Sequence, residues 1–426
     1  MRVQIEPGKA SGTVCPPPSK SLLHRMLICA ALADGESVLR NFSVSEDLAA
    51  TIDCLRAMGA QIRQEGNSCC VRGFAKTTDK KNSALPILPC RESGSTLRLL
   101  LPLSLLRDSG IRHSGINHSG IDLDGISGGI FTGSKRLLER GVGVYESLLP
   151  PRGITFSEDD HALTVQGELT CGDYRIPGNV SSQFVSGMLL ALPFLPGDST
   201  VTVLPPSESR PYIALTTSVL QSFGITIESP EELCFRIRGG QKAHPANVRA
   251  EGDWSQAAFF LALNFLGGTV SVSGLNENSL QGDRICQTLL EEVANKTPEA
   301  DLSECPDLSP ILFALAAAHS GAHFTGTRRL AFKESNRALA MAQELAKFGI
   351  SVRVTENDAA ILPGRLHRPE TDLDGHGDHR IVMALAILAT VTGGTITGAE
   401  AVRKSYPNFF RDLSALGIRL RTTGEA

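Results

Sequence analysis

The sequence predicts an α/β protein of two lobes, with apolar helices inside each lobe and β-sheets around them. Three observations support this prediction. A unit of strand, helix, strand and helix recurs six times along the 426 residues. One helix in each unit is apolar on nearly every face, and the Gly- and Pro-containing segment 239–245 reads as a linker between two groups of three units. Units this small cannot each bury two faces alone, so they have to pack together.

The six apolar helices each begin near polar residues that can cap a helix and end near a glycine. The segment 381–387, for example, contains only apolar residues, and a helix without a polar face is a buried helix. The expected ranges are 21–35, 95–110, 181–197, 254–268, 308–321 and 379–394.

In four of the units the elements after the apolar helix are also clear. A short strand is expected at 36–39, 199–204, 323–326 and 395–397, then a helix at 48–58, 212–223, 336–348 and 406–416, then a strand at 59–62, 224–227, 349–352 and 417–420. We divide the chain into one lobe of residues 1–18 plus 241–426 and a second lobe of residues 19–240. A solenoid, in which all six units stack in one row, is the alternative arrangement.

Composition and charge exclude several classes of protein. Lys plus Arg number 41 and Asp plus Glu 45, a net charge of −4, so the chain is not a nucleic-acid binder that works through bulk positive charge. There is no run of about 18 apolar residues to span a membrane, and the first residues do not resemble a signal peptide. The ten cysteines include no Cys-x-x-Cys pair, so we expect reduced thiols in a cytoplasmic protein and no metal site.

Polar and charged residues gather at the N-terminal ends of the six apolar helices. Backbone N–H groups and the positive end of the helix dipole favour anions there, and arginine adds a planar group that matches carboxylate and phosphate. If these ends face one cleft, they form a site for negatively charged ligands. The residues are Ser19, Lys20, Ser21, Arg25, Ser93, Gly94, Ser95, Thr96, Arg98, Ser181, Ser182, Gln183, Glu251, Gly252, Asp253, Pro306, Asp307, Asp378, His379 and Arg380.

Several of these features also have a simpler interpretation. Ser95, Ser181 and Asp253 could be helix caps and nothing more. Three charges within the segment 333–337 are typical of a solvated surface. The Ser-Gly-Ile repeat at 109–129 could be a phosphate-binding loop or only a lengthened surface loop, and it is not a P-loop because no helix with a Gly-Lys-Ser start follows it.

Several segments taken together resemble motifs of the 5-enolpyruvylshikimate-3-phosphate synthase family. They are 17–25, 93–98, 136–140, 181–184, 251–253, 333–337, 378–380 and 404–407, and the resemblance runs in order from about residue 6 to residue 420. It implies two lobes, each an inside-out α/β barrel of three repeats, with the active-site cleft between them. It also implies the reaction: phosphoenolpyruvate and shikimate 3-phosphate give the enolpyruvyl ether and inorganic phosphate, without a metal or an organic cofactor, in aromatic amino-acid biosynthesis.

The same resemblance implies which residues bind each substrate. Shikimate 3-phosphate would contact Lys20, Ser21, Arg25, Ser181, Ser182, Gln183, Ser209, Asp307 and Lys333, with Arg329 as a further, variable contact. Phosphoenolpyruvate would contact Lys20, Gly94, Arg136, Gln183, Arg337, Arg380 and Lys404. The expected catalytic residues are Asp307, which takes the hydroxyl proton, and Glu334, which with Lys20 delivers a proton to carbon. These small molecules are the only partners expected, and we expect a monomer.

Two rival functions stay open. An enolpyruvyl transferase that acts on a UDP-sugar shares the implied fold, but that family carries a reactive cysteine in a mobile loop, and the corresponding segment 108–132 has no cysteine. A repeat scaffold that binds proteins on a concave face is the rival from another class. Such a scaffold would not need eight cations placed at helix and loop starts.

Overall fold

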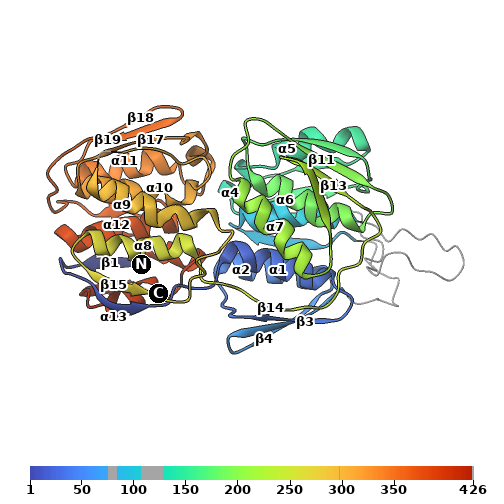
Figure 1. The fold of residues 1–426 in the computed structure, drawn as a ribbon, viewed down its shortest axis with the longest axis horizontal. Coiled ribbons are helices and arrows are strands. Elements are labelled where there is room, and N and C mark those ends of the chain that lie inside the picture. The colour runs from blue at the N-terminus through green and yellow to red at the C-terminus, as the bar shows by residue number, and fades with distance from the viewer. Residues whose placement is uncertain (75–83, 107–127, 297, 425–426) are drawn as a thin grey trace, which may run out of the picture. The chain divides into compact units, whose positions relative to one another are not determined.

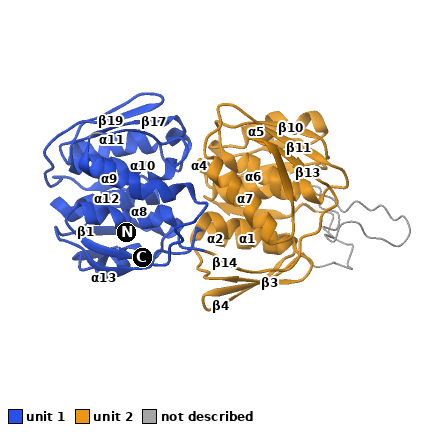
Figure 2. Cartoon of the chain, in the orientation of Figure 1, with its two compact units in different colours: residues 1–19, 251–426 blue, residues 20–250 orange. Residues whose placement is uncertain are grey.

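The computed structural model describes residues 1–74, 84–106, 128–296 and 298–424, and the chain forms two compact units (Figure 2). Residues 1–19 and 251–426 form one, here called the discontinuous unit, and residues 20–250 form the continuous unit. The second crossing lies at residue 250 rather than at residue 240, because β14 (Asn247–Arg249) pairs in parallel with β3 (Glu36–Arg40) of the continuous unit. The Ser-Gly-Ile repeat, up to residue 127, lies outside the described residues.

The six apolar helices predicted from the sequence are confirmed, three in each unit (Figure 1). They are α1 (Lys20–Leu32), α3 (Gly94–Ser104), α6 (Ser182–Ala191), α8 (Trp254–Phe265), α10 (Ser309–Ala318) and α12 (His379–Thr392). Each ends before the glycine that was expected to stop it. In α6 the cause is Pro193, which follows in the next turn and has no N–H to continue the hydrogen-bond ladder.

The four helices expected at 48–58, 212–223, 336–348 and 406–416 are also confirmed, with shifted ends. They are α2 (Glu46–Ala57), α7 (Arg210–Ser222), α11 (Arg337–Lys347) and α13 (Phe409–Ala415), and the structure adds α4 (Lys135–Glu139), α5 (Gly143–Leu148) and α9 (Cys286–Asn295). Gly349, just past α11, has a φ of +87°, a left-handed conformation that ends a helix at little cost only for glycine. α13 starts later than residue 406, because the 3-10 helix η6 (Ala399–Lys404) and Pro407 occupy the preceding turn.

In its described residues the continuous unit has three four-stranded sheets, and each has one parallel pair followed by two antiparallel pairs. In spatial order they are β14-β3-β5-β4, β6-β7-β9-β8 and β10-β11-β13-β12. The remaining bounds are β4 (Gln61–Glu65), β5 (Ser68–Arg72), β6 (Ile87–Arg91), β7 (Gly128–Gly133), β8 (Thr155–Glu158), β9 (Ala162–Gln166), β10 (Asp173–Pro177), β11 (Ser199–Leu204), β12 (Ile227–Glu231) and β13 (Cys234–Ile237).

The discontinuous unit has two sheets of the same pattern and one two-stranded sheet. They are β16-β17-β19-β18, β20-β21-β1-β22 and β15-β2. Their bounds are β1 (Arg2–Ile5), β2 (Ser11–Val14), β15 (Thr269–Val272), β16 (Glu299–Asp301), β17 (Ala322–Thr325), β18 (Val352–Val354), β19 (Asp358–Ile361), β20 (Leu373–Asp374), β21 (Gly394–Thr397) and β22 (Leu420–Thr423). The first two strands of the chain thus complete sheets whose other strands come from its second half.

Each unit has its own hydrophobic core, built mainly from its three apolar helices and the inner faces of its sheets. Every residue of α12 from His379 to Thr390 is buried. The buried helices therefore carry polar residues mainly at their N-terminal ends, where the substrate-binding candidates lie. Among the described residues, no helix combines the length and the hydropathy needed to cross a membrane.

Candidate active site

Asp307 is the centre of a charged cluster in the discontinuous unit. It lies in the 3-10 helix η4 (Pro306–Leu308), which leads directly into the buried helix α10. Its Oδ1 accepts hydrogen bonds from Lys333 Nζ at 3.1 Å and from Arg337 Nη1 at 2.8 Å, and its Oδ2 accepts one from Arg380 Nη2 at 2.9 Å. Three cations from two separate segments, 333–337 and 378–380, therefore meet at one carboxylate.

Arg337 and Arg380 are held in place by further contacts. Arg337 Nε donates to Asp378 Oδ2 at 2.8 Å, and Asp378 also caps α12 by accepting from the backbone N–H of Arg380 at 2.9 Å. Arg380 Nη2 donates to Ser255 Oγ at 3.0 Å. Each guanidinium group thus has an orientation set by contacts on more than one side.

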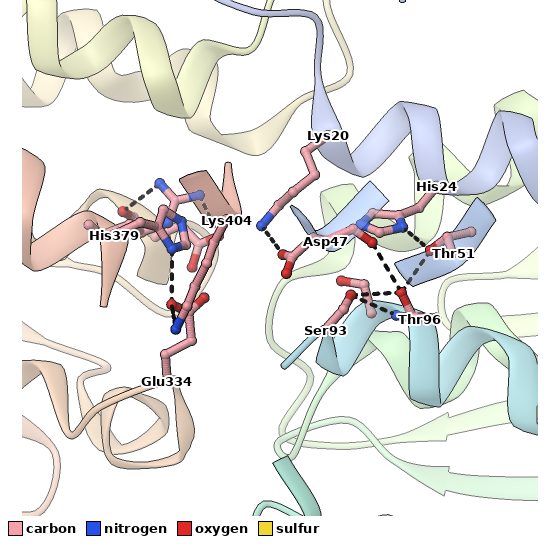
Figure 3. A network of polar contacts seen from close by, with 12 residues as sticks. Lys20, His24, Asp47, Thr51, Ser93, Thr96, Glu334, His379 and Lys404 are labelled. Carbon is pink, nitrogen blue, oxygen red and sulfur yellow. Dashed lines mark hydrogen bonds and ion pairs between the residues drawn. The ribbon is translucent and has the colours of Figure 1, made fainter. Parts of the chain in front are cut away.

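Glu334 is the second carboxylate of this cluster, and Figure 3 shows it with His379 and Lys404. His379 Nδ1 lies 3.0 Å from Glu334 Oε2, and Lys404 Nζ lies 3.8 Å from the same oxygen. Lys404 also donates to the backbone oxygen of Gly377. The carboxylate of Glu334 is therefore in contact with a histidine that can exchange a proton with it.

The two carboxylates are ionised in this environment. Burial raises the pKa of Asp307, but Arg380, Lys333 and Arg337 lower it by more, so its pKa lies well below the usual value. Burial is likewise outweighed at Glu334, where His379 and Lys404 hold the pKa well below its usual range. Burial lowers the pKa of Lys333 to about 8, against the opposing effect of Asp307.

A second polar group lies in the continuous unit, at the start of α1. Lys20 Nζ contacts Asp47 Oδ2 at 2.7 Å, and Asp47 belongs to the first turn of α2. Beside it, as Figure 3 shows, a chain of buried hydrogen bonds links the three helices α1, α2 and α3: His24 Nδ1 to Thr51 Oγ1, and Thr51 Oγ1 to Thr96 Oγ1, each at 2.7 Å.

The proton of His24 can be assigned from this chain. Burial lowers the pKa of His24 to about 3, so the ring is neutral and carries one N–H. Its Nε2 is buried and has no hydrogen-bond partner among the described residues. A buried N–H without an acceptor costs more than an unpaired lone pair, so we place the proton on Nδ1, where it donates to Thr51.

Gln183 is positioned by two neighbours on α3. Its Oε1 accepts from Arg98 Nη1 at 3.0 Å, and its Nε2 donates to Ser95 Oγ at 2.9 Å. Ser95 is therefore not a helix cap; the cap of α3 is Ser93, which accepts from the backbone N–H of Thr96. Both polar atoms of the Gln183 amide are in use, so the side chain has a fixed orientation.

Arg25 makes more hydrogen bonds within the protein than the sequence suggested. Its guanidinium group is buried and donates to Thr216 Oγ1, Ser21 O, Ser186 Oγ and Tyr212 O. These bonds use four of its five N–H groups, so at most one remains for a ligand. Burial lowers its pKa to about 10, which still leaves it charged at neutral pH.

The other predicted substrate-binding residues of the continuous unit lie at or near the starts of helices. Ser181 caps α6 by accepting from the backbone N–H of Gln183, and Ser182 is the first residue of that helix. Ser209 is buried and precedes α7 with a φ of 57°. An added Cβ at Gly94 would lie 2.9 Å from Arg140 Nη2, so the Arg140 side chain would have to shift. Arg136 on α4 is 44% exposed, and its Nη1 lies 4.0 Å from Glu139 Oε2.

Comparison with known proteins identifies the family. The family model described as EPSP synthase (3-phosphoshikimate 1-carboxyvinyltransferase) matches residues 5–413.

The chain belongs to the EPSP synthase family.

Two relatives and one solved structure show the extent of the likeness. A 3-phosphoshikimate 1-carboxyvinyltransferase of Clostridium kluyveri is 36% identical over 436 residues, and one of Clostridium botulinum (strain Eklund 17B) is 37% identical over 444 residues. Each match covers 97% of this chain and 97% of the relative. The structure of an EPSP synthase from Acinetobacter baumannii has a TM-score of 0.76 at 22% identity and covers 99% of this chain and 100% of that chain, a likeness of fold.

In this member of the EPSP synthase family, four residues for which the sequence analysis expected no substrate-binding or catalytic role contact the assigned residues. Asp47 and Asp378 form ion pairs with assigned cations, His379 contacts Glu334, and Arg98 holds Gln183. Asp378, His379 and Arg98 stand inside the motifs that were quoted, so the motifs contained the signal. Asp47 had no such signal, because only folding brings α2 next to Lys20.

One group in this member of the EPSP synthase family resembles a metal site by distance alone. Among the described residues, ligand atoms of Glu334, Asp378 and His379 lie close enough together to hold one ion. However, Arg337 contacts Asp378 and Lys404 contacts Glu334, so protein cations already offset both carboxylates. We therefore assign no metal to this group.

Proposed function

We propose that this chain transfers the enolpyruvyl group of phosphoenolpyruvate to the 5-hydroxyl of shikimate 3-phosphate, giving 5-enolpyruvylshikimate 3-phosphate and inorganic phosphate. One observation carries the proposal: Lys333, Arg337 and Arg380, each within a motif that resembles the family, converge on Asp307. Family membership over residues 5–413 supports it. Both substrates are small acids with a phosphate and a carboxylate, and such groups bind where cations are concentrated.

The finer features of the fold belong to the same proposal. We propose that each unit is an inside-out α/β barrel of three repeats and that polar groups of both units contribute to substrate binding. The buried apolar helices and the repeated sheet pattern support the first part. The placement of substrate-binding candidates at helix starts in both units supports the second.

The proposed contacts follow the assignment made from the sequence. Shikimate 3-phosphate would bind to Lys20, Ser21, Arg25, Ser181, Ser182, Gln183, Ser209, Asp307 and Lys333, and phosphoenolpyruvate to Lys20, Gly94, Arg136, Gln183, Arg337, Arg380 and Lys404. Because most N–H groups of Arg25 bind protein atoms, its role is mainly structural. Its positive charge would attract shikimate 3-phosphate more than direct hydrogen bonds would. Each polar atom of the Gln183 amide makes one protein hydrogen bond and can make a second, which supports a direct contact.

The addition step requires two proton movements. The hydroxyl of shikimate 3-phosphate has to lose a proton as it attacks, and the methylene carbon of phosphoenolpyruvate has to gain one. We assign the first to Asp307 as general base and the second to Glu334 assisted by Lys20. The tetrahedral adduct then eliminates phosphate: its C–O bond to phosphate breaks, and a proton leaves the new methyl group to restore the C=C bond of the enolpyruvyl ether.

Ligand binding would prepare the carboxylates for these roles. Both carboxylates are ionised among the protein's own cations, which hold their pKa values down. A substrate carboxylate that binds Arg337 and Arg380 would compete with Asp307 for these cations and so raise its pKa toward that of a useful base. His379, at 3.0 Å from Glu334, offers a route by which Glu334 gains the proton that it must deliver.

We also propose that the protein works as a monomer in the cytoplasm. All ten cysteines are free thiols, which supports a reducing compartment. Gel filtration with light scattering at several concentrations tests the oligomeric state, and a dimer that persists on dilution would contradict this part of the proposal.

Thermal unfolding distinguishes the proposed substrate from that of the closest rival function. A ligand present at about 100 times its dissociation constant stabilises the folded state by about 2.7 kcal/mol. We expect shikimate 3-phosphate to raise the melting temperature and a UDP-sugar at the same concentration to leave it unchanged. The reverse result would assign the protein to enolpyruvyl transfer to a UDP-sugar.

A further inference from the structure

Glu344 is a buried carboxylate that the proposed reaction does not use. It lies on α11, three residues before the end of that helix, and only 2% of its side chain is exposed. Its Oε1 is 3.0 Å from His376 Nε2, and its Oε2 accepts from the backbone N–H of Asp374 at 2.9 Å. Lys347 Nζ also donates to this carboxylate, at 3.0 Å from Oε1 and 2.8 Å from Oε2.

These contacts hold the loop 374–378, which leads into the buried helix α12. His376 has a φ of 49°, an unfavourable left-handed conformation for a residue with a side chain, so the loop needs contacts to keep it in this shape. The backbone at Gly375 packs closely against α12, since an added Cβ would lie 2.5 Å from Val382 Cγ2. The Glu344 carboxylate thus holds the loop from one side, while α12 lies against it from another.

The loop in turn sets the position of candidate phosphoenolpyruvate-binding residues. Its last residue, Asp378, binds Arg337 and caps the helix that carries Arg380. The backbone oxygen of Gly377 accepts from Lys404. Helix α11 therefore contacts the loop at two points. Arg337, at the start of the helix, binds Asp378, and Glu344, near the end of the helix, binds Asp374 and His376.

We propose that His376 is a positioning residue for phosphoenolpyruvate, because its contact with Glu344 fixes the loop that orients Arg337, Arg380 and Lys404. This proposal rests on the proposed function of the site. It does not place His376 against the substrate: the histidine acts through the loop. Its loss should therefore weaken binding of phosphoenolpyruvate selectively and change the chemical step little.

The charge of His376 should make this effect depend on pH. The contact with Glu344 raises the pKa of His376, and burial opposes this. The other charged groups around it are Asp374, which favours the charged ring, and Lys347, which disfavours it. With a raised folded pKa, the ion pair is complete below about pH 6.5 and weakens to a neutral hydrogen bond as the pH rises through the folded pKa.

The test compares His376→Phe, which keeps a ring and removes the hydrogen bond, with His376→Gln, which keeps a neutral donor. The matched control is His323→Phe, since His323 on β17 also lies near two carboxylates, with Nδ1 3.5 Å from Glu299 Oε1 and Nε2 3.7 Å from Asp358 Oδ1. Initial rates of phosphate release are measured with one substrate varied at a time, from pH 6 to pH 8.5. Comparing each variant with the wild type at the same pH cancels the titration of the substrates and of other site residues.

We expect His376→Phe to raise the KM for phosphoenolpyruvate about three- to tenfold, less than the full loss of a charge-assisted hydrogen bond, because His376 acts on the substrate only through the loop. The KM for shikimate 3-phosphate and kcat should change by less than about twofold. His376→Gln should restore the KM and show a weaker dependence on pH than the wild type, and His323→Phe should match the wild type.

An unchanged KM for phosphoenolpyruvate in His376→Phe, or an equal rise for both substrates, would overturn the proposal. If His376→Phe does not fold, the pH dependence of His376→Gln decides, because identical dependence in this variant and the wild type would also overturn it. A wild-type enzyme that releases no phosphate would instead contradict the proposed function, so the two failures are distinguishable.

Discussion

Arg337 and Asp378 form a buried ion pair, with 2.8 Å between Nε and Oδ2 and side chains that are 2% and 0% exposed. Asp378 also caps α12, so one carboxylate orients the arginine and starts the helix that carries Arg380. Two candidate phosphoenolpyruvate-binding residues thus depend on a residue that is not itself assigned to either substrate.

Replacing Asp378 by Asn should therefore cost both stability and affinity. Asparagine still caps the helix, but Arg337 loses a charged partner, and breaking a buried ion pair costs about 3 to 5 kcal/mol. We expect the lower end, about 3 kcal/mol, since Arg337 keeps its contact with Asp307. Urea unfolding measures the loss. Asp372→Asn, which breaks the exposed pair with Arg2, is the control and should change stability little.

Asp307 and Glu334 should each be needed for turnover. General acid–base catalysis contributes about 10²- to 10⁴-fold, so Asp307→Asn and Glu334→Gln should each lower kcat on that scale while the protein stays folded. Steady-state phosphate release gives kcat, and circular dichroism checks the fold. Wild-type turnover in both variants would remove the two carboxylates from the mechanism.

The lowered pKa values of these two carboxylates predict a dependence of stability on pH. A carboxyl group whose pKa is lower in the folded state stabilises the fold above its unfolded pKa, about 4, and loses that contribution as the pH falls through its folded pKa. Between pH 5 and pH 3 the wild type should therefore lose stability more steeply than the double variant Asp307→Asn, Glu334→Gln. Urea unfolding at several pH values measures both slopes, and equal slopes would be inconsistent with the ionised pair.

Asp47 should matter through Lys20. The ion pair at 2.7 Å fixes the direction of the Lys20 ammonium group, so Asp47→Asn should lower kcat/KM about tenfold, the equivalent of 1.4 kcal/mol. Lys20→Met should lower it further, since it removes the group itself. Asp53 lies on the same helix and pairs with Arg91 at 2.6 Å, which makes Asp53→Asn a matched control with unchanged activity expected. A loss as large in the control as in Asp47→Asn would show a general effect on α2.

The sequence predicted the buried helices well and the sheets incompletely. A helix such as α12 can be predicted because its sequence is a long apolar run, and such a run is stable in a folded chain only when it is buried. The strands β5, β13 and β19, which return after short turns, were not predicted. β5 (Ser68–Arg72), with a polar residue at each end and two cysteines, lacks a clear alternation, and only its pairing with β3 and β4 makes it a strand.

The site shows the same division between local and long-range information. Lys333, Glu334 and Arg337 stand together in the sequence, so the motif gave them directly. That Asp307 would receive three cations, or that Gln183 would be held by Arg98, depends on segments far apart in the chain. For Ser95 the local pattern suggested a cap, and the structure shows a hydrogen bond to Gln183 instead.

Release of phosphate is the most direct test of the proposed reaction. It is measured with both substrates present and then with each one left out. We predict release only when phosphoenolpyruvate and shikimate 3-phosphate are present together, with one enolpyruvyl ether formed for each phosphate. No release from the complete mixture, or equal release from phosphoenolpyruvate alone, would contradict the account.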